Sequence, residues 1–492
     1  MKDLHKLSIS QSLEGYINKD FSVLEMVEAT INHASKHKNL NVFVTETFEQ
    51  AMIEAKKSDI LYAKKENRGL EGALIAIKDL FCTKGVRTTA CSKILANFVP
   101  PYDATVVRRI NDAGSISIGK TNMDEFAMGS SNTTSYFGQV QNPWKALNSN
   151  EILVPGGSSG GSSACVSAFM SMAALGSDTG GSVRQPAAFT GTVGIKPSYG
   201  RCSRYGMVAF SSSLDQAGIF ARSCIDAALV LEYMMGDDQK DATCADLKVP
   251  KIRDNLDSNL QGLRIGIPKD IMSYEGISSE ILDMWKNTAK LLEERGMSLV
   301  DISLTSAQHA LAVYYIIASA EASSNLSRYD GIRYGYRTEQ EVTSLDELYE
   351  ITRSEGFGNE VKRRIMIGTH VLSSGFMDAY YLKAQKIRKM IVQDFNKAFE
   401  ACDVILMPTA PTPAFSAQNQ HSDPVNMYLN DIFTIPASLA GLPAMSVPAD
   451  FSKNHLPLGM QIIGRNFDEL SVLKVGNIIE KTLNLDLNPR GF

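Results

Sequence analysis

The chain has 492 residues, of which 44% are hydrophobic and 21% charged, and its formal net charge at pH 7 is −5. These values are typical of an ordinary globular protein with a sizeable core. The acidic balance excludes a chain whose overall charge alone attracts nucleic acid, so a basic surface would have to come from a partner.

The cysteines and the apolar segments indicate where the protein works. The seven cysteines are scattered without CxxC pairs and their number is odd, which is typical of free thiols in a reducing compartment. The first ten residues contain no apolar signal core, and no segment reaches about 18 uncharged apolar residues. We therefore expect no membrane span and a cytoplasmic location.

The first part of the chain predicts helices followed by a buried strand. Ser22 and Glu25 form a capping-box pattern, and residues 45–66 are a charged amphipathic run, so residues 1–66 are expected to be a helical cover. Residues 70–81 are short, branched and apolar on both faces, which is typical of a buried strand. Lys78 lies at the end of that strand.

Lys78 permits two interpretations. A lysine between Ile77 and Leu80 commonly extends its amine to solvent along an apolar stem. A buried amine behaves differently, because burial disfavours the ammonium and lowers the pKa by several units from about 10.4, which leaves a neutral base. The residues around Lys78 leave both interpretations open.

Residues 114–121 match the pattern GxxxxGKT of a phosphate-binding loop. Such a loop needs a strand before its first glycine and a flexible segment between the glycines. Here a predicted helix, residues 104–112, comes before Gly114, and residues 115–118 are predicted to form a strand. We therefore do not expect a nucleotide site at this segment.

The stretch 154–201 contains two Gly/Ser-rich turns, residues 156–163 and 176–182. The apolar residues 163–175 between them predict a buried helix that Gly176 ends. A flexible linker is disfavoured because linkers do not border a core helix on both sides. Glycine turns let successive N–H groups converge on an anion, and serine hydroxyls can act as nucleophiles.

A second pattern, GxSxG at residues 156–160, is the nucleophile elbow of hydrolases that use a histidine base. The chain has no histidine between His37 and His309, and the later ones lie in no recognisable motif. A serine–histidine mechanism is therefore not expected, and neither is a metal site made by these histidines.

After residue 200 the sequence alternates between helical and strand patterns. A predicted helix, residues 278–296, separates two predicted strands, so we expect a βαβ unit with parallel strands. The polar segment 236–261 is predicted to be a surface excursion. The predicted strands are residues 263–268, 298–304 and 404–407, and the predicted helices are residues 221–235, 278–296, 307–328 and 380–401.

Three separated elements resemble one known family. Lys78, Ser158 in the first Gly/Ser turn and the segment GSDTGGSVRQP at residues 176–186, which contains Ser182, appear in the order and spacing of the amidase signature family. The resemblance implies an α/β fold with a mixed β-sheet sandwiched between layers of α-helices. It also implies one amidase domain over residues 1–492, formed by the 1–66 cover, a 67–235 core with the catalytic triad, and a 236–492 remainder that completes the sheet and the substrate pocket.

The resemblance implies a Ser-cis-Ser-Lys mechanism. Ser182 is expected to attack the side-chain amide of glutamine and form an acyl-enzyme, while Ser158 passes the proton to neutral Lys78. Backbone N–H groups of Thr179, Gly180, Gly181 and Ser182 are expected to hold the oxyanion. The bottom-up pattern alone does not decide which serine attacks; that assignment rests on the resemblance.

Free glutamine carries an α-carboxylate and an α-ammonium, so a selective pocket needs a cation and an anion. The resemblance places these in Arg364 and Asp431, with Tyr315 nearby. Within residues 362–364 and 314–315 the assignment stays open by one position.

Further segments match the branch of the family that supplies ammonia to tRNA-dependent amidotransferases. The resemblance then implies a heterotrimer with the B and C subunits of the amidotransferase, of which the first binds charged tRNA and uses ATP with Mg²⁺ and the second wraps against this chain. No cofactor is expected on this chain, and both glutamyl-tRNA(Gln) and aspartyl-tRNA(Asn) stay open as acceptors. The matching segments are residues 119–131, 325–335 and 360–364.

Three alternative functions fit parts of the sequence. One is a stand-alone hydrolase of another small amide, since the triad does not itself select the substrate. Another is a nucleotide-binding protein that uses residues 114–121. The third is a silent assembly subunit, which the intact Lys78, Ser158 and Ser182 disfavour.

Overall fold

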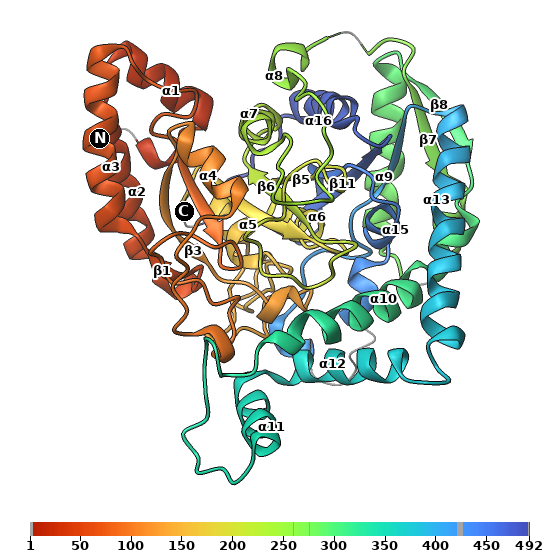
Figure 1. The fold of residues 1–492 in the computed structure, drawn as a ribbon. Helices are drawn as coiled ribbons and strands as arrows, with labels where there is room; N and C mark the ends of the chain where they lie inside the picture. The colour runs from red at the N-terminus through yellow and green to blue at the C-terminus, as the bar shows by residue number, and fades with distance from the viewer. Residues whose placement is uncertain (1–2, 259, 275, 421–426, 491) are drawn as a thin grey trace.

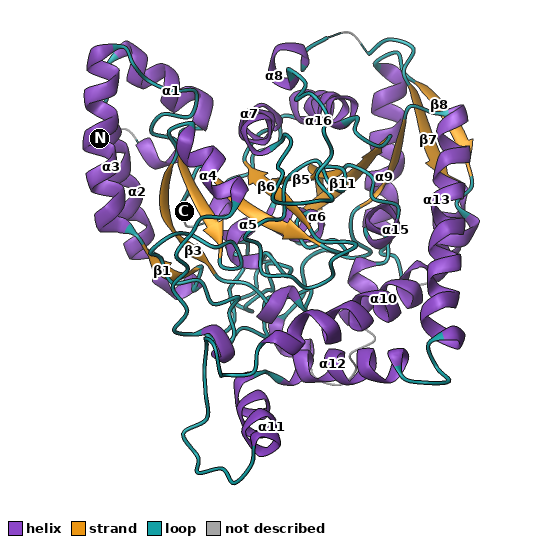
Figure 2. Ribbon diagram, viewed as in Figure 1, coloured by secondary structure: helices purple, strands orange, loops and turns teal. Residues whose placement is uncertain are grey.

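One β-sheet runs through the whole molecule, and helices cover both of its faces (Figures 1 and 2). The computed structural model describes residues 3–258, 260–274, 276–420, 427–490 and 492. The eleven strands lie in the order β1-β3-β2-β4-β6-β5-β10-β11-β9-β7-β8. The strands are β1 (Phe43–Glu46), β2 (Leu74–Lys78), β3 (Ile116–Thr121), β4 (Ala173–Asp178), β5 (Val193–Lys196), β6 (Gln216–Ala221), β7 (Arg264–Pro268), β8 (Ser298–Ile302), β9 (Val404–Pro408), β10 (Ala444–Phe451) and β11 (Pro457–Gly464).

The helices confirm the predicted α/β class. Among those described, none is both long enough and apolar enough to cross a membrane. The α-helices are α1 (Ile9–Asn18), α2 (Val23–Lys36), α3 (Phe48–Lys64), α4 (Thr105–Asp112), α5 (Gly160–Ser167), α6 (Arg184–Thr190), α7 (Cys224–Met234), α8 (Ile252–Asn255), α9 (Ser279–Glu294), α10 (Ala310–Asn325), α11 (Leu345–Gly356), α12 (Asn359–Leu372), α13 (Lys383–Ala401), α15 (Ile435–Leu439) and α16 (Glu469–Leu483).

Two glycines of β11 show how the helical layers sit on the sheet. A Cβ atom at Gly459 would meet Ala188 of α6, and one at Gly464 would meet Val472 of α16. Residues an odd number apart on a strand point to opposite faces, so α6 and α16 cover opposite faces of the sheet. The missing side chains let both helices approach closely, which produces the predicted sandwich of helices around a mixed sheet.

Parallel pairing in the sheet determines where the functional side chains gather. Strand β2 runs parallel to both β3 and β4, so the carboxyl ends of β2 and β4, Lys78 and Asp178, meet at one edge. The predicted βαβ unit is confirmed, because β7 pairs in parallel with β8 from Arg264 opposite Ser298, with α9 between them in the chain.

The N-terminal segment follows its sequence signals closely. Ser22 and Glu25 form the predicted capping box at the start of α2. The amphipathic run at residues 45–66 divides, because its first residues belong to β1, which pairs antiparallel with β3, and its remainder forms α3. Helices α1, α2 and α3 lie together at the left edge of Figure 1.

The prediction of one helix over residues 163–175 was wrong. Helix α5 ends at Ser167, Phe169 takes a positive φ of 56°, and Ala173 to Asp178 form β4 between β2 and β6. A fully buried central strand needs no polar alternation, so a run of small apolar residues does not distinguish strand from helix. The residue with the positive φ after α5 is Phe169, so the sequence has no glycine there to indicate that the helix ends.

The GKT segment is part of a strand. Strand β3 includes Gly119, Lys120 and Thr121, and the Lys120 amine is fully buried, where it donates to the Phe81 carbonyl at 2.8 Å and to the Thr88 hydroxyl at 2.6 Å. These residues therefore do not form a phosphate-binding loop.

Candidate active site

Lys78 is surrounded by serine hydroxyls. Its side chain is fully buried at the end of β2. Its Nζ atom donates to the Oγ atoms of Ser158 and Ser159, each at 2.7 Å, and of Ser177 at 2.9 Å. The structure therefore brings the predicted Lys78 and Ser158 into direct contact, and the interpretation of Lys78 as a solvent-exposed surface lysine was wrong.

Burial lowers the pKa of Lys78 from its ordinary value to about 7, although the nearby carboxylates of Asp124 and Asp178 oppose the change. The amine is therefore partly neutral near neutral pH. Two other lysines in the described part of the chain are as deeply buried, Lys120 and Lys196. Lys196 donates to the carbonyl oxygens of Pro197 and Leu442. Of the three, Lys78 alone contacts serine hydroxyls.

The backbone on either side of Ser158 is tightly held. The Gly157–Ser158 peptide bond is cis. The Gly157 N–H donates to the side-chain oxygen of Gln185 at 3.0 Å, and the Ser158 carbonyl accepts from the Asp124 N–H at 3.1 Å. A Cβ atom at Gly157 would lie 2.1 Å from the Asp124 carboxylate, so only glycine fits beside it. This packing fixes the position of Ser158 next to Lys78.

Ser182 lies in the turn between β4 and α6. The Ser159 N–H donates to the Ser182 carbonyl at 3.3 Å, which places this turn beside the first Gly/Ser turn. Ser182 is 7% exposed whereas Ser158 is fully buried, so a ligand reaches Ser182 more readily. Over the described ranges, neither the Ser182 hydroxyl nor the N–H groups of residues 179–182 donate to a protein acceptor. Four consecutive donors are thus available at the turn.

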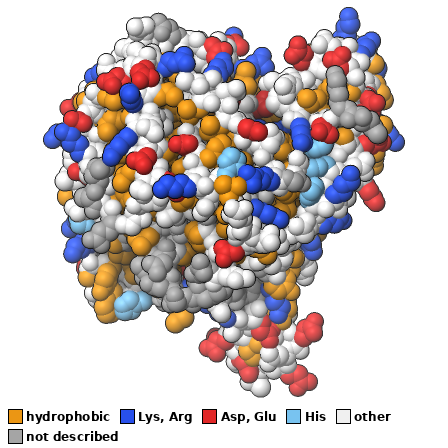
Figure 3. Space-filling model, turned by 180° about the vertical axis from the view of Figure 1, so that it is seen from behind, with side chains coloured by type: hydrophobic (Ala, Val, Ile, Leu, Met, Phe, Trp, Pro, Cys, Tyr) orange, Lys and Arg blue, Asp and Glu red, His pale blue; other side chains and the backbone are white. Residues whose placement is uncertain are grey.

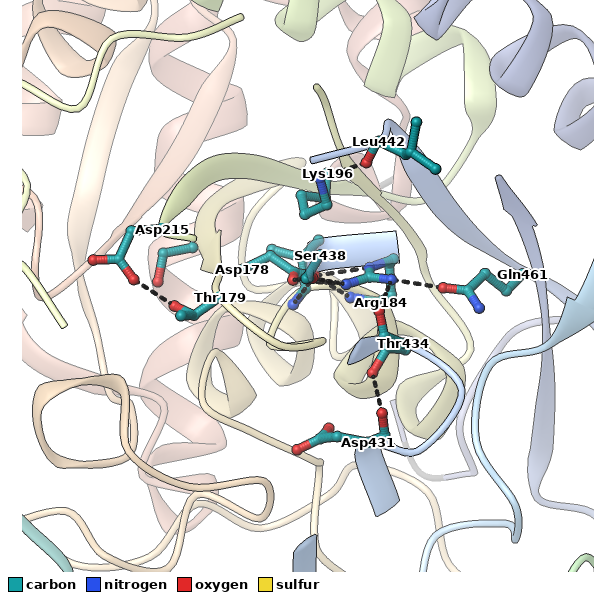
Figure 4. Close-up of polar contacts among 12 residues, drawn as sticks. Asp178, Thr179, Arg184, Lys196, Asp215, Asp431, Thr434, Ser438, Leu442 and Gln461 are labelled. Atoms are coloured by element: carbon teal, nitrogen blue, oxygen red, sulfur yellow. Dashed lines mark hydrogen bonds and ion pairs between the residues drawn. The ribbon is translucent and has the colours of Figure 1, made fainter. Parts of the chain in front are cut away.

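A buried ion pair anchors both ends of this turn (Figure 4). The Arg184 guanidinium contacts both carboxylate oxygens of Asp178, at 3.0 and 2.8 Å. Although burial opposes ionisation, Arg184 holds the pKa of Asp178 below its usual value. Arg184 also donates to the Thr434 carbonyl at 2.8 Å and to the side chains of Gln461 and Ser438, each at 2.7 Å. One side chain thus joins the Ser182 turn to α15 and β11.

The start of the turn is held separately. The Thr179 hydroxyl donates to the Asp215 carboxylate at 2.7 Å, and the N–H groups of Phe210 and Ser211 donate to the other carboxylate oxygen at 2.8 and 2.9 Å. Figure 4 shows Thr179 pointing to Asp215, away from Arg184. Both flanks of the turn are therefore held by buried polar contacts.

Asp431 lies beside the same turn. A Cβ atom at Gly181 would be 3.1 Å from Asp431 Oδ1 and 2.1 Å from the Thr434 hydroxyl. The Ser130 hydroxyl donates to Asp431 Oδ2, but within the described residues Oδ1 is buried without a hydrogen-bond partner. Burial raises the pKa of Asp431 to about 7, and the Ser130 hydrogen bond opposes that rise. An unpaired buried carboxylate oxygen is suited to accept from a ligand cation.

Arg364 is buried beside two stacked tyrosine rings. Its guanidinium carbon lies 4.5 Å from the ring centre of Tyr315 and 4.9 Å from that of Tyr428, and the two rings stack at 4.0 Å. Its Nε atom contacts Glu360 at 2.7 Å. The neighbouring Arg363 has a 44% exposed side chain. Of these two arginines, Arg364 alone points inward.

The two candidate tyrosines contact different parts of the site. Tyr315 packs on Arg364, whereas Tyr314 packs on the Ser182 turn, since a Cβ atom at Gly180 would lie 2.8 Å from the Tyr314 hydroxyl. Both tyrosines belong to α10, which therefore contacts both the arginine and the turn.

Sequence reasoning missed several contacts in this region. Ser159 and Ser177 belong to the two Gly/Ser turns, and their composition was the available signal. No local signal marked Ser130 or Tyr428, because they lie in segments distant from their partners, whereas Glu360 lies one helical turn before Arg364 on α12. The missed residues are Ser159, Ser177, Ser130, Glu360 and Tyr428.

The comparisons with known proteins agree on one family. The family model described as Amidase matches residues 25–473. The A subunit of glutamyl-tRNA(Gln) amidotransferase from Orientia tsutsugamushi (strain Ikeda) is 58% identical over 492 residues and all of both chains. The protein of the same name from Rickettsia bellii (strain OSU 85-389) is also 58% identical, over 493 aligned positions that span both chains in full.

Solved structures share the fold along nearly the whole chain. The crystal structure of the A subunit of glutamyl-tRNA(Gln) amidotransferase from Thermotoga maritima has a TM-score of 0.79 at 39% identity, covering 98% of this chain and 96% of that one. A protein described as part of an unexpected vestigial complex that reveals the origins of an s-triazine catabolic enzyme has a TM-score of 0.83 at 28% identity. The match covers 97% of this chain and 98% of that protein.

Proposed function

The chain belongs to the amidase family, and we propose that within it this protein is the glutamine-hydrolysing subunit of a tRNA-dependent amidotransferase. The relatives that are 58% identical over their full length carry the name of such a subunit. The observation that supports the chemistry most directly is the contact between the buried Lys78 amine and the Ser158 hydroxyl.

In the proposed first step, Ser182 Oγ attacks the amide carbon of the glutamine side chain. Its proton passes to Ser158, whose own proton moves to neutral Lys78. The pKa of about 7 supports this role, because a lysine at its ordinary pKa would be protonated and unable to accept. The additional contacts of Lys78 with Ser159 and Ser177 fix the amine in place.

The carbon then becomes tetrahedral and its oxygen gains negative charge. The available N–H groups of Thr179, Gly180, Gly181 and Ser182 are the proposed donors to that oxygen, and in other enzymes losing one such donor costs roughly 3 kcal/mol of transition-state stabilisation. Collapse of this intermediate breaks the C–N bond, and Lys78 returns a proton through Ser158 so that ammonia leaves. Water then hydrolyses the acyl-enzyme, which releases glutamate and restores Ser182.

The pocket residues supply the two charges that glutamine requires. We propose that Asp431 Oδ1, which is buried without a partner among the described residues, accepts from the α-ammonium. Arg364, which contacts the rings of Tyr315 and Tyr428, would bind the α-carboxylate. Asp431 lies beside Gly181 of the Ser182 turn, and Arg364 packs on Tyr315, whose neighbour Tyr314 contacts Gly180, so the side-chain amide of a bound glutamine would extend toward Ser182.

The remaining steps belong to two partner subunits in this proposal. The net charge of −5 offers no overall attraction for tRNA, so one partner would bind the charged tRNA. The same partner would use ATP with Mg²⁺ to activate the side-chain carboxylate of the amino acid that the tRNA carries. The other partner would wrap against this chain. Ammonia must travel from Ser182 without meeting bulk water, because protonation to ammonium destroys its nucleophilicity. The protein would act in the cytoplasm, where charged tRNA is used.

The test supplies the complete complex with glutamine that carries ¹⁵N at its amide, together with excess unlabelled ammonium and charged tRNA. Enclosed transfer predicts predominantly ¹⁵N-labelled product on the tRNA. Running the assay with glutamyl-tRNA(Gln) and with aspartyl-tRNA(Asn) identifies the acceptor. Label in proportion to the bulk ammonia pool would show that no enclosed route exists. Full activity of the isolated chain on small amides, with no complex formed, would favour the stand-alone hydrolase.

A further inference from the structure

An exposed apolar surface lies at the end of the molecule where α12 connects to α13. Of the twenty large hydrophobic side chains that are exposed in the described part of the chain, seven fall within residues 366–390. We define these seven as the α12–α13 face. Its members are Met366, Ile367, Phe376, Met377, Tyr380, Leu382 and Met390.

Aromatic side chains pack together at the centre of the α12–α13 face. The His370 ring lies 4.3 Å from that of Phe376, and Phe376 stacks on Tyr380 at 6.0 Å. In Figure 3, hydrophobic side chains gather beside a histidine at the lower left, which is the region of the α12–α13 connection in Figure 1. Met366, the most prominent member, is 72% exposed. Contiguous apolar patches of this kind mark sites of protein association, whereas isolated exposed residues do not.

The charges around the α12–α13 face are mainly positive. Four exposed lysines lie along α13, at positions 383, 386, 389 and 397, and none forms an ion pair with a described residue. Asp378 is an acidic residue inside the face. A complementary surface would therefore present apolar side chains with carboxylates at its edge. The large apolar share favours a protein over nucleic acid, whose contacts are mostly made by cations with phosphate.

Helix α12 lies between the α12–α13 face and the proposed glutamine pocket, to which Arg364 belongs. Val361 and Arg364 are buried, whereas Met366 and His370 lie on the opposite side of the helix. Glu360 connects the two sides directly, because one of its carboxylate oxygens contacts the exposed Arg363 and the other contacts the buried Arg364. A partner that binds the outer side of α12 would therefore affect the position of Arg364.

We propose that the α12–α13 face binds another component of the amidotransferase, one whose contact surface combines apolar side chains with carboxylates, and that this contact fixes α12 and so orients Arg364. The identity of the partner rests on the proposed function. A solved relative with the same fold is described as part of a protein complex, in line with a docking role for this fold.

The experiment compares complexes formed by variants of the full chain with the two partner subunits. One variant carries Met366→Asp and Phe376→Asp, and a second carries Lys386→Glu and Lys389→Glu. The matched control carries Ile53→Asp and Lys56→Glu, because these residues are likewise exposed on a helix, α3, at the other end of the molecule. Affinity is measured by titration of the purified partners, and the Michaelis constant for glutamine is measured in the assembled complex.

The apolar variant should weaken the affinity for the partner at least about tenfold, since central apolar contacts dominate binding. The charge-reversal variant should also weaken it, because the new glutamates repel the partner's carboxylates. The control should leave the affinity unchanged. The charge-reversal variant should lose the salt dependence of association. At subsaturating partner the Michaelis constant for glutamine should rise in both variants, and added partner should restore it. The isolated variants should keep the thermal unfolding profile of the wild type, because the substituted residues are exposed.

Three results would overturn the inference. Unchanged partner affinity in both face variants, while the wild-type complex forms and transfers ammonia, would refute the surface and leave the proposed function intact. Loss of tRNA binding with an intact protein complex would assign the lysines to nucleic acid. A change in self-association, measured by light scattering, would assign the face to a second copy of the chain. If the wild type forms no complex, the proposed function itself fails.

Discussion

The Lys78 amine and the Ser158 hydroxyl lie 2.7 Å apart in a fully buried environment. The distance is that of a direct hydrogen bond, so a proton can pass between the two atoms without an intervening water. Burial supplies the second requirement, because it lowers the pKa of the amine to about 7. The amine is therefore partly neutral at neutral pH, as the proposed role of a base requires.

Replacing the proposed nucleophile should separate the two half-reactions. Ser182→Ala removes the attacking oxygen, so glutamine hydrolysis should fall by roughly 10³-fold or more. Amide transfer from added ammonium salts should persist in the assembled complex, because the acceptor site lies on a partner. Glutamate release and tRNA amidation, measured on the same preparation, check this expectation. Undiminished hydrolysis of glutamine would rule out Ser182 as the nucleophile.

Members of a proton relay act as a unit, so the reductions in kcat caused by replacing each member should not combine in the double variant. Lys78→Ala should reduce kcat nearly as much as Ser182→Ala, and the double variant should be little worse than either. The measurement is kcat for all three variants under one set of conditions. Multiplicative losses would show that Lys78 serves only the packing of the core.

Activity should rise with pH as Lys78 loses its proton. The lowered pKa of about 7 means that the neutral amine is the minor form below pH 7 and the major form above it. For an uncharged amide substrate, kcat/KM should therefore increase about tenfold per pH unit below neutrality and level off above it. An uncharged substrate is chosen because its binding does not depend on Asp431. A profile that is flat through neutrality would contradict the assignment.

Substrate selectivity should depend on the two buried charges of the pocket. Arg364→Ala and Asp431→Asn should each raise the Michaelis constant for glutamine at least about tenfold, while an uncharged amide is affected little. The pKa of Asp431 is about 7, so the Michaelis constant for glutamine should fall as pH rises through neutrality. The Asp431→Asn variant should lose that pH dependence. Normal glutamine kinetics in both variants would place the pocket elsewhere.

Breaking the Asp178–Arg184 pair should destabilise the whole protein. Arg184→Met leaves the Asp178 carboxylate buried without its cation, which typically costs about 3–5 kcal/mol. The matched control is Arg264→Met, which removes a partly exposed pair with Asp403 that is expected to contribute little to stability. Melting temperatures of the two variants should therefore differ clearly. Equal melting temperatures would show that the buried pair contributes nothing beyond a surface pair.

The sequence predicted which side chains lie at the candidate site better than it predicted the backbone around them. Glycines and serines at residues 156–163 and 176–182 marked two turns with nucleophile and donor groups, and the apolar run before Lys78 marked a buried strand end. The apolar residues 163–175 led to the wrong prediction of one helix, because a buried helix and a buried strand have the same composition. Pairing with β2 and β6 decides that strand, and those partners lie far away in the chain.

The sequence by itself determined which side chains can react, because residue type and local pattern set nucleophilicity, turn geometry and the tendency to be buried. Only the tertiary structure decided which of them meet. Parallel pairing of β2 and β4 brings Lys78 to the serines, and packing of distant segments places Asp431 beside Gly181 and Arg364 against Tyr315. Burial then sets the pKa values of Lys78 and Asp431, since the loss of solvent depends on every segment that closes over them.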